Sequence, residues 1–283
     1  MQLGLGTVQF GLDYGISNSS GRVGPEEIQR ILDYCSKTNI QLFDTASLYG
    51  KSEEVLGRTI ASDGSVKIVT KLPPCAHLTG DEIDNSFAQS LRNLNTSQVY
   101  GLMLHSGADL LGPNGQEIYA RLEKYKSQNR ATKIGVSVYT PEETLKIIDR
   151  FEIDLVQLPV NVFDQRFIQS NVLQELKSRN VEIHARSTFL QGLLLMELSE
   201  LPPYFAPFRE HIEHYFKSRG NAPLVPAIQF VKKLNLVDYL IVGVTSQQEL
   251  AQIVNAYQQD CHLDFSSFAC SDEGLILPTN WTL

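Results

Sequence analysis

The sequence predicts a single (β/α)8 barrel, and three observations lead to this fold class. Eight short β-rich runs alternate with helical patterns along the 283 residues. Most of the runs are nearly continuous in apolar residues, which is typical of parallel strands covered on both faces. The length is close to the roughly 250 residues of a typical barrel of this kind. A doubly wound open sheet is the alternative, but "GLGTVQFG" lacks the G-x-G-x-x-G spacing of its phosphate turn.

The strand candidates follow one another at regular intervals. In chain order they are residues 2–7, 40–44, 66–72, 99–106, 132–139, 154–161, 181–188 and 239–245. No finer repeat, low-complexity tract or linker interrupts the alternation, so we read residues 1–283 as one domain.

Helix start signals stand between the strands. Pro25 is followed by two glutamates, which suits a first helical turn. Capping boxes are predicted at Thr79, Thr140 and Ser246, each with a glutamate three residues later. The stretch 193–235 is too long for one crossover and is expected to hold an extra helix.

Composition excludes several classes of function. The net charge is −8, with 24 basic and 32 acidic residues and no basic cluster, so we expect no nucleic-acid binding. No apolar run approaches the roughly 18 residues of a membrane helix, and the N-terminus lacks the features of a signal peptide. The four cysteines have no metal-binding spacing and suit a reducing, cytoplasmic location. His211-x-x-His214 has no third ligand nearby, so no metal site is predicted.

Four residues of matched chemistry follow consecutive strands. The carboxyl ends of barrel strands meet at one mouth, which brings together Asp44, Lys71 and His105, with Tyr49 on the loop after Asp44. Lys71 would lower the pKa of the Tyr49 phenol, Asp44 would hold Lys71, and His105 would polarise the same substrate oxygen. Such a group suits proton transfer to a carbonyl or alcohol oxygen, and a nicotinamide hydride would supply the other half of the reaction. Each residue alone is more often a cap, a packing residue or a surface charge.

The chain resembles the aldo-keto reductase family over nearly its whole length. The motifs that carry the resemblance are "GLGT", "FDTASLYGKSEEVLG", "IVTK", "LMLHS", "KIGVSVY", "VQLPVNVFD", "STFLQGLL" and "IVGVTSQQEL". The resemblance implies a (β/α)8 barrel, a catalytic set of Asp44, Tyr49, Lys71 and His105, and NADPH bound without a Rossmann domain. The family's N-terminal hairpin is expected to be absent, since residues 2–7 already form strand one. The opening "GLGTVQFGLDYGI" and closing "LPTNW" are similar to a bacterial branch associated with sugar or polysaccharide metabolism.

The same resemblance implies a cofactor site with departures from the family pattern. Ser137 and Gln157 match the groups that hold the nicotinamide amide, but Val138 replaces the usual Asn. Arg186 stands where an aromatic residue usually stacks on the nicotinamide; it would reach the pyrophosphate or an anionic substrate group, or form a salt bridge at the rim. The remaining cofactor-binding candidates are Gly6, Thr7, Ser187, Phe189, Gln191 and Gly192.

The loop after the last strand bears on the choice of cofactor. Gly243 and Glu249 occupy positions where NADP-preferring members carry basic residues, and Glu249 would repel a 2′-phosphate. Thr245 and the helix N-terminus would still offer backbone N–H groups to a phosphate. Members of the family usually bind NADP(H), so the resemblance favours that cofactor, whereas these residues make NAD(H) possible.

Substrate-binding candidates come from loop placement and, for Trp281, from the resemblance, which implies that the C-terminal segment walls the substrate pocket; core packing is the alternative for Trp281. They are Phe10, Tyr14, Asn161, Phe163 and Trp281. The predicted function is reduction of an aldehyde or ketone, sugar-like and hydroxylated, with Tyr49 as general acid. The alternatives are an aldose or sugar-alcohol dehydrogenase, a cofactor-binding regulatory subunit with little turnover, and a cofactor-independent lyase or isomerase. A small-molecule substrate, no nucleic-acid or membrane partner, and a monomer or weak homo-oligomer are expected.

Overall fold

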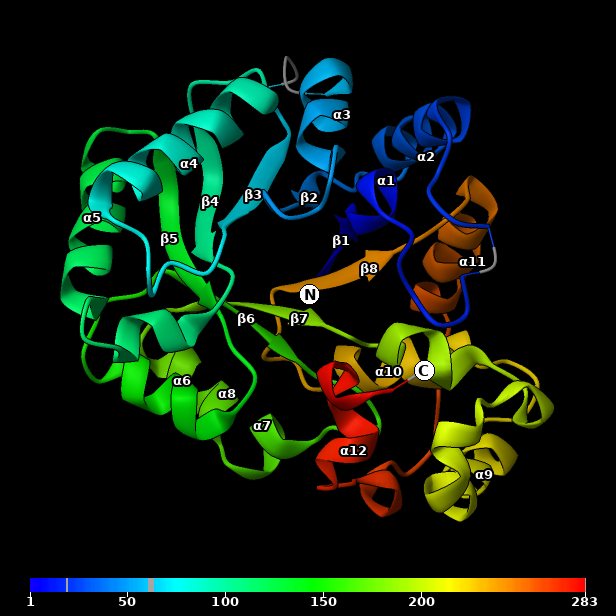
Figure 1. The fold of residues 1–283 in the computed structure, drawn as a ribbon. Helices are drawn as coiled ribbons and strands as arrows, with labels where there is room; N and C mark the ends of the chain where they lie inside the picture. Colours follow the sequence, from blue (N-terminus) through cyan, green and yellow to red (C-terminus); the bar gives the residue numbers. More distant parts are fainter. Residues whose placement is uncertain (19, 61–63, 283) are drawn as a thin grey trace.

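The computed structural model describes residues 1–18, 20–60 and 64–282 and confirms the predicted barrel. Eight parallel strands close in chain order, with β1 paired to both β2 and β8. Figure 1 shows the strands at the centre and the helices around them. The strands are β1 (Gln2–Gly6), β2 (Leu42–Asp44), β3 (Lys67–Leu72), β4 (Val99–Leu104), β5 (Ala131–Ser137), β6 (Leu155–Pro159), β7 (Glu182–Arg186) and β8 (Tyr239–Gly243).

The helices lie between consecutive strands and at the chain's C-terminal end. They are α1 (Val8–Gly11), α2 (Pro25–Lys37), α3 (Ser52–Thr59), α4 (Gly80–Asn93), α5 (Gly115–Ser127), α6 (Pro141–Ile148), α7 (Arg166–Gln169), α8 (Val172–Ser178), α9 (Arg209–Arg219), α10 (Leu224–Lys232), α11 (Gln247–Gln258) and α12 (Glu273–Ile276). The one-turn helix α1 follows β1 directly, where the sequence predicted none. Within the described residues, no helix is long and apolar enough to cross a membrane.

Apolar side chains form two layers of core. A large cluster fills the space between the strands and the surrounding helices. A smaller cluster inside the barrel contains Leu42, Val69, Met103 and Leu155, each fully buried and each from a different strand. The strands are therefore covered on both faces, which explains why their sequences read as continuous apolar runs.

The predicted helix caps form, although only one is reciprocal. Thr79 and Glu82 exchange hydrogen bonds as a complete capping box. At α11, Ser246 accepts a hydrogen bond from the Glu249 N–H, but the Glu249 carboxylate accepts from Thr245, one residue before the cap. The Glu249 carboxylate is thus directed at the loop between β8 and α11.

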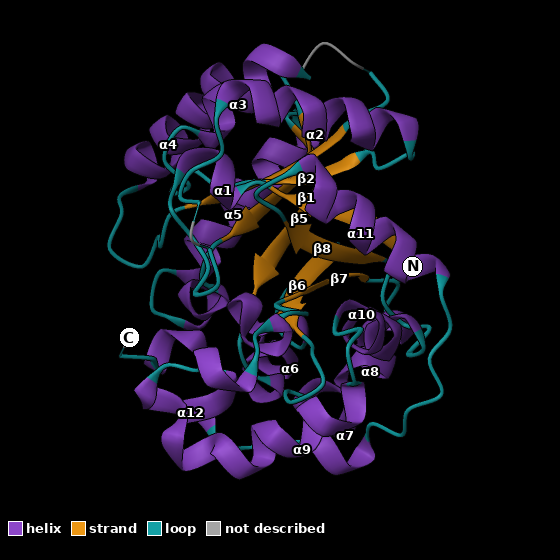
Figure 2. Ribbon diagram, turned by 90° about the vertical axis from the view of Figure 1, so that its right-hand side faces the viewer, coloured by secondary structure: helices purple, strands orange, loops and turns teal. Residues whose placement is uncertain are grey.

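The long segment after β7 holds the extra helix that its length predicts. Helix α9 precedes α10, and in both ribbon views it lies on the same side of the barrel as α12 (Figures 1 and 2). The Tyr204 hydroxyl donates a hydrogen bond of 3.0 Å to the carbonyl of Gly274. This segment and the C-terminal segment therefore pack together beside the barrel.

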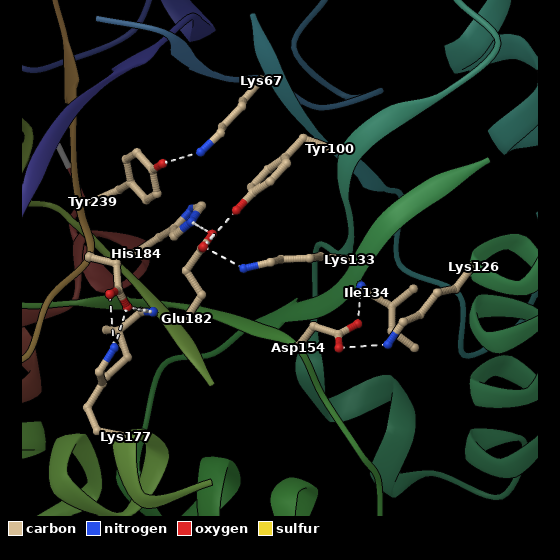
Figure 3. Close-up of polar contacts among 12 residues, drawn as sticks. Lys67, Tyr100, Lys126, Lys133, Ile134, Asp154, Lys177, Glu182, His184 and Tyr239 are labelled. Carbon is tan, nitrogen blue, oxygen red and sulfur yellow. Dashed lines mark hydrogen bonds and ion pairs between the residues drawn. The ribbon is translucent and has the colours of Figure 1, made fainter. Parts of the chain in front are cut away.

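A polar network closes the N-terminal end of the barrel, at the starts of the strands (Figure 3). Glu182 accepts hydrogen bonds from the Tyr100 hydroxyl at 2.7 Å and from Lys133 Nζ at 2.6 Å, and it lies 2.8 Å from His184 Nε2. Lys67 Nζ donates to the Tyr239 hydroxyl at 2.8 Å. These residues come from β3, β4, β5, β7 and β8, so the network joins strands on different sides of the barrel.

Candidate active site

The four predicted catalytic residues converge at the carboxyl end of the barrel. Lys71 Nζ lies 2.7 Å from each carboxylate oxygen of Asp44 and 3.1 Å from the Thr45 carbonyl oxygen. The Lys71 ammonium is 5.1 Å from the centre of the Tyr49 ring. Tyr49 in turn meets His105 edge to face, with 5.9 Å between the ring centres. Residues spread over 62 positions of sequence thus form one contact group, because the strand ends share one mouth.

Burial sets the electrostatics of this group. Asp44 and Lys71 are 3% and 1% exposed. Burial alone would lower the pKa of Lys71, but the adjacent Asp44 carboxylate outweighs it and raises that pKa. The ammonium is therefore held charged.

Tyr49 differs from the sequence-based expectation. Burial raises the pKa of the Tyr49 phenol, and the neighbouring Lys71 opposes the rise without cancelling it. The expected lowering is therefore corrected: desolvation of the phenolate outweighs the cation. Tyr49 stays protonated at neutral pH, which makes it a proton donor.

His105 is held in its neutral form. Burial, followed by the charge of Lys71, lowers the pKa of His105 to about 4. His105 Nδ1 is buried and has no hydrogen-bond partner among the described residues. A neutral imidazole with a free ring nitrogen is suited to hydrogen-bond a substrate oxygen.

A cavity of about 750 Å³ opens above these residues. It is lined by the catalytic four, by Tyr14 and by all twelve predicted cofactor-binding residues: Gly6, Thr7, Ser137, Gln157, Arg186, Ser187, Phe189, Gln191, Gly192, Gly243, Thr245 and Glu249. Gln157 also donates a hydrogen bond of 2.7 Å to Asp44 Oδ1. The sequence did not indicate this second role.

Four of the five predicted substrate-binding residues lie outside the cavity lining. Phe10 is buried in the core. Asn161 accepts from the N–H groups of Phe163 and Asp164 and donates to the Ser187 carbonyl, so its amide holds the turn after β6. Phe163 packs against His211 at 5.0 Å between ring centres. These three side chains turn inward from their loops, which corrects their predicted contact with substrate.

The C-terminal segment reaches the cavity through residues other than the predicted one. Trp281 packs edge to face on Phe205, with ring centres 4.9 Å apart. Pro278 and Thr279 line the cavity instead. The C-terminal segment therefore contributes Pro278 and Thr279 to the cavity wall, and not Trp281 as predicted.

Several lining residues were missed although a signal existed. Gln9 lies in α1, just beyond the end of β1, and Tyr139 lies just beyond the end of β5; both line the cavity. The strand-end rule that selected Asp44 and His105 would also have selected them.

Arg186 has no salt bridge within the described part of the chain. Its guanidinium carbon lies 4.4 Å from the centre of the Tyr139 ring. Nη2 donates to the Val138 carbonyl at 3.1 Å, and Nη1 donates to Ser187 Oγ at 3.3 Å. The rim salt bridge considered from the sequence is replaced by stacking and hydrogen bonds.

The first loop crosses the loop after β7. Gly192 has a φ of 98°, and a Cβ there would lie 1.9 Å from Ser17 Oγ. The Ile16 N–H donates to the Gln191 carbonyl at 3.1 Å. Glycine is thus required at 192 because another loop approaches its backbone closely.

The N-terminus of α11 is already satisfied by carboxylates of the protein. The Thr245 N–H donates to Glu249 at 2.7 Å, and the Thr245 hydroxyl donates to the same carboxylate at 2.8 Å. The Gln247 N–H donates to Glu27 at 2.7 Å. The backbone N–H groups of Thr245 and Gln247 therefore have partners, and the two partners carry negative charge.

The cavity suits a polar ligand such as a dinucleotide. Gln9 Oε1, His105 Nδ1 and Thr188 Oγ1 are buried and lack partners among the described residues, and all three residues line the cavity. Buried polar atoms are rarely left unsatisfied, so these atoms indicate that a ligand completes them. The same part of the chain contains no group of three or more His, Cys, Asp or Glu side chains arranged to hold a metal ion.

Comparison with known proteins gives one family and one fold. The model of the aldo/keto reductase family matches residues 2–272. No curated protein sequence matches the chain. An aldo-keto reductase from Bacillus halodurans, solved in its holo form, superposes with a TM-score of 0.76 at 19% identity, covering 94% of this chain and 89% of that one. A glycerol dehydrogenase from Gluconobacter oxydans superposes with a TM-score of 0.71 at 22% identity, covering 92% and 87%. At these identities the two structures show a shared fold.

Proposed function

Since the chain belongs to the aldo/keto reductase family, a family of nicotinamide-dependent oxidoreductases, we propose that it reduces a hydroxylated, sugar-like aldehyde or ketone to the alcohol. The observation that carries this proposal is the Tyr49 phenol, buried against the Lys71–Asp44 pair and beside a neutral His105. The family generally uses NADP(H). The bound nicotinamide supplies the hydride.

Side chains of the protein supply the proton and stabilise the phenolate that its loss leaves. Tyr49 remains protonated at neutral pH and donates its proton to the carbonyl oxygen as that oxygen gains charge. Lys71 then stabilises the phenolate, and Asp44 keeps Lys71 charged and in place. His105, which is neutral, donates a hydrogen bond from its ring N–H to the same oxygen and so orients the carbonyl.

The polar lining supports a hydroxylated substrate. Gln9, Thr188 and Gln191 add amide and hydroxyl groups around the mouth. Oxidation of an aldose or sugar alcohol, by the reverse reaction, remains the second candidate because the same residues serve both directions. Glycerol, the substrate in the name of the Gluconobacter neighbour, is a simple polyol for testing it.

The preferred cofactor depends on two carboxylates. The family generally uses NADP(H). In this chain, however, the carboxylates of Glu27 and Glu249 lie at the N-terminus of α11, where a 2′-phosphate would need positive charge. We infer that NAD(H) is accepted at least as well as NADP(H).

The test is a Tyr49→Phe variant assayed with glyceraldehyde and NAD(P)H, and with glycerol and NAD(P)⁺. We expect a loss of roughly a thousandfold in kcat, because the proton donor is removed. The dissociation constant of the cofactor, measured by fluorescence titration, should stay within about threefold. Tyr34→Phe is the matched control, since Tyr34 lies on α2 away from the cavity.

Two outcomes would contradict the proposal. Full activity of Tyr49→Phe would remove Tyr49 from the reaction. Cofactor binding by the wild-type protein without turnover of any carbonyl or polyol would favour a regulatory subunit instead.

A further inference from the structure

Arg186 is a cation inside the cavity whose charge no carboxylate balances in the described residues. Two acids line the cavity, Asp44 and Glu249. Asp44 is paired with Lys71, and Glu249 accepts two hydrogen bonds from Thr245. Among the described residues, Arg186 is therefore the cation of the cavity lining that forms no ion pair, while Glu249 keeps its negative charge at the N-terminus of α11.

The Arg186 guanidinium is held in a fixed orientation. Tyr139 stacks on it at 4.4 Å, and the Val138 carbonyl and Ser187 hydroxyl each accept one of its hydrogen bonds. A guanidinium has five N–H donors, so three remain for a ligand. Such a pre-oriented fork matches the geometry of a carboxylate.

The charge of Arg186 acts at the reacting end of the cavity. It opposes the rise in the pKa of Tyr49 and adds to the fall in the pKa of His105, in both cases after the larger effects of burial, Lys71 and Asp44. It acts in the same way on Tyr14, which is 43% exposed at the mouth. Because Arg186, Tyr49 and His105 line one cavity, an anion bound to Arg186 would share that cavity with the carbonyl that Tyr49 protonates.

We propose that the substrate carries a carboxylate, which Arg186 binds, so that the enzyme acts on an acidic sugar or a related hydroxylated oxo acid. This inference rests on the proposed carbonyl reduction and specifies its substrate class. In the reaction the carbonyl carbon gains a hydride and its oxygen gains the Tyr49 proton, while the carboxylate is unchanged. The carboxylate would form the ion pair that Arg186 lacks among the described residues.

The probe pair is D-glucuronate and D-glucose, which share an aldehyde and a hydroxylated chain and differ in a carboxylate at carbon six. Binding of each sugar to the cofactor-loaded protein is measured by saturation-transfer NMR and calorimetry, and turnover is measured separately. We expect the wild-type protein to prefer glucuronate by roughly tenfold or more in both Kd and kcat/KM. The preference should weaken as ionic strength rises.

Three variants isolate the role of Arg186. Arg186→Gln should bring the glucuronate-to-glucose ratio close to one, and Arg186→Lys should retain part of it. Arg209→Gln, an exposed arginine at the start of α9, removes the same charge away from the cavity and should leave the ratio as in the wild type. The dissociation constant of the cofactor is measured for every variant.

The outcomes separate this inference from the proposed function. Equal or undetectable binding of the two sugars by the wild-type protein would overturn the inference. A loss of cofactor affinity in Arg186→Gln with unchanged sugar selectivity would also overturn it and assign Arg186 to the cofactor. Charge-selective binding without hydride transfer would support the acidic-ligand site and reject the proposed reduction.

Discussion

Gln157 donates a hydrogen bond of 2.7 Å to the same Asp44 oxygen that accepts one from Lys71. The carboxylate at the end of β2 is thus tied to β3 on one side and to β6 on the other. A charge buried to this degree is tolerated only when it is paired and hydrogen-bonded. Asp44 meets both conditions, so it both positions Lys71 and holds the barrel mouth together.

Replacing Asp44 should therefore affect stability as well as activity. In Asp44→Asn the buried Lys71 ammonium loses its counter-charge, which we expect to cost about 3–5 kcal/mol in the free energy of unfolding. Urea unfolding followed by circular dichroism measures this loss. Activity should also fall, since Lys71 is no longer held against Tyr49.

A double variant provides the control. Asp44→Leu combined with Lys71→Met removes both charges and should regain part of the lost stability while remaining inactive. If Asp44→Asn alone unfolded at the same urea concentration as the wild type, the pair would not be buried as described.

The pH dependence of catalysis follows from two shifted groups. Burial raises the pKa of Tyr49, and reduction needs the protonated phenol, so the reductive kcat should stay level through pH 6–9 and fall only above about pH 10. Oxidation needs the phenolate and should rise over the same alkaline range. His105, with a pKa of about 4, stays neutral above about pH 5. Profiles of kcat in both directions test this, and an inflection near pH 6.5 would show that His105 titrates normally.

The barrel could be predicted from the sequence because each strand is marked by its own continuous run of apolar residues. The continuous apolar runs and the capping residues specify elements one at a time, and parallel strand ends meet by geometry alone. Asp44, Lys71 and His105 could therefore be placed together without knowledge of their contacts.

Loop side chains could not be predicted in the same way. Asn161 and Phe163 follow β6 as Tyr139 follows β5, yet Tyr139 lines the cavity and the other two turn into the interior. Loop conformation decides this difference, and it depends on packing against distant segments such as α9. The pKa direction of Tyr49 was missed for a related reason: it is a balance of burial and charge, and sequence reveals only the charge.

Cofactor choice is predicted to depend on Glu249. Its carboxylate holds the Thr245 N–H and hydroxyl, and Glu27 holds the Gln247 N–H, so a 2′-phosphate would meet two negative charges. Wild-type protein should bind NADH at least as tightly as NADPH. Glu249→Arg should tighten NADPH binding by roughly tenfold and change NADH binding far less. Fluorescence titration with both cofactors measures the two constants.

A charge-matched control accompanies this variant. Glu210→Arg makes the same change at an exposed position on α9, away from the cavity, and should leave the NADPH-to-NADH ratio unchanged. Tight binding of NADPH alone by the wild-type protein would show that other groups hold the 2′-phosphate.

The network at the N-terminal end of the barrel should govern acid stability. Burial alone would raise the pKa of Glu182, but hydrogen bonds from His184, Lys133 and Tyr100 lower it to about 2. Because this pKa is depressed in the folded state, the stabilisation is present above the ordinary glutamate pKa near 4.5 and is lost as the pH falls toward 2. Its size is on the order of 3 kcal/mol at neutral pH.

Glu182→Gln tests this network by urea unfolding at a series of pH values. The variant should be less stable than the wild type at pH 7, and the difference should shrink between about pH 4.5 and pH 2 as the wild-type carboxylate protonates. Glu213→Gln, which removes a partly exposed carboxylate paired with Lys217 on α9, should leave the unfolding midpoint nearly unchanged. Because the network lies at the end of the barrel opposite the cavity, kcat should be retained at temperatures where both proteins are folded. A difference in stability that did not vary with pH would mean that Glu182 acts through packing and not through its charge.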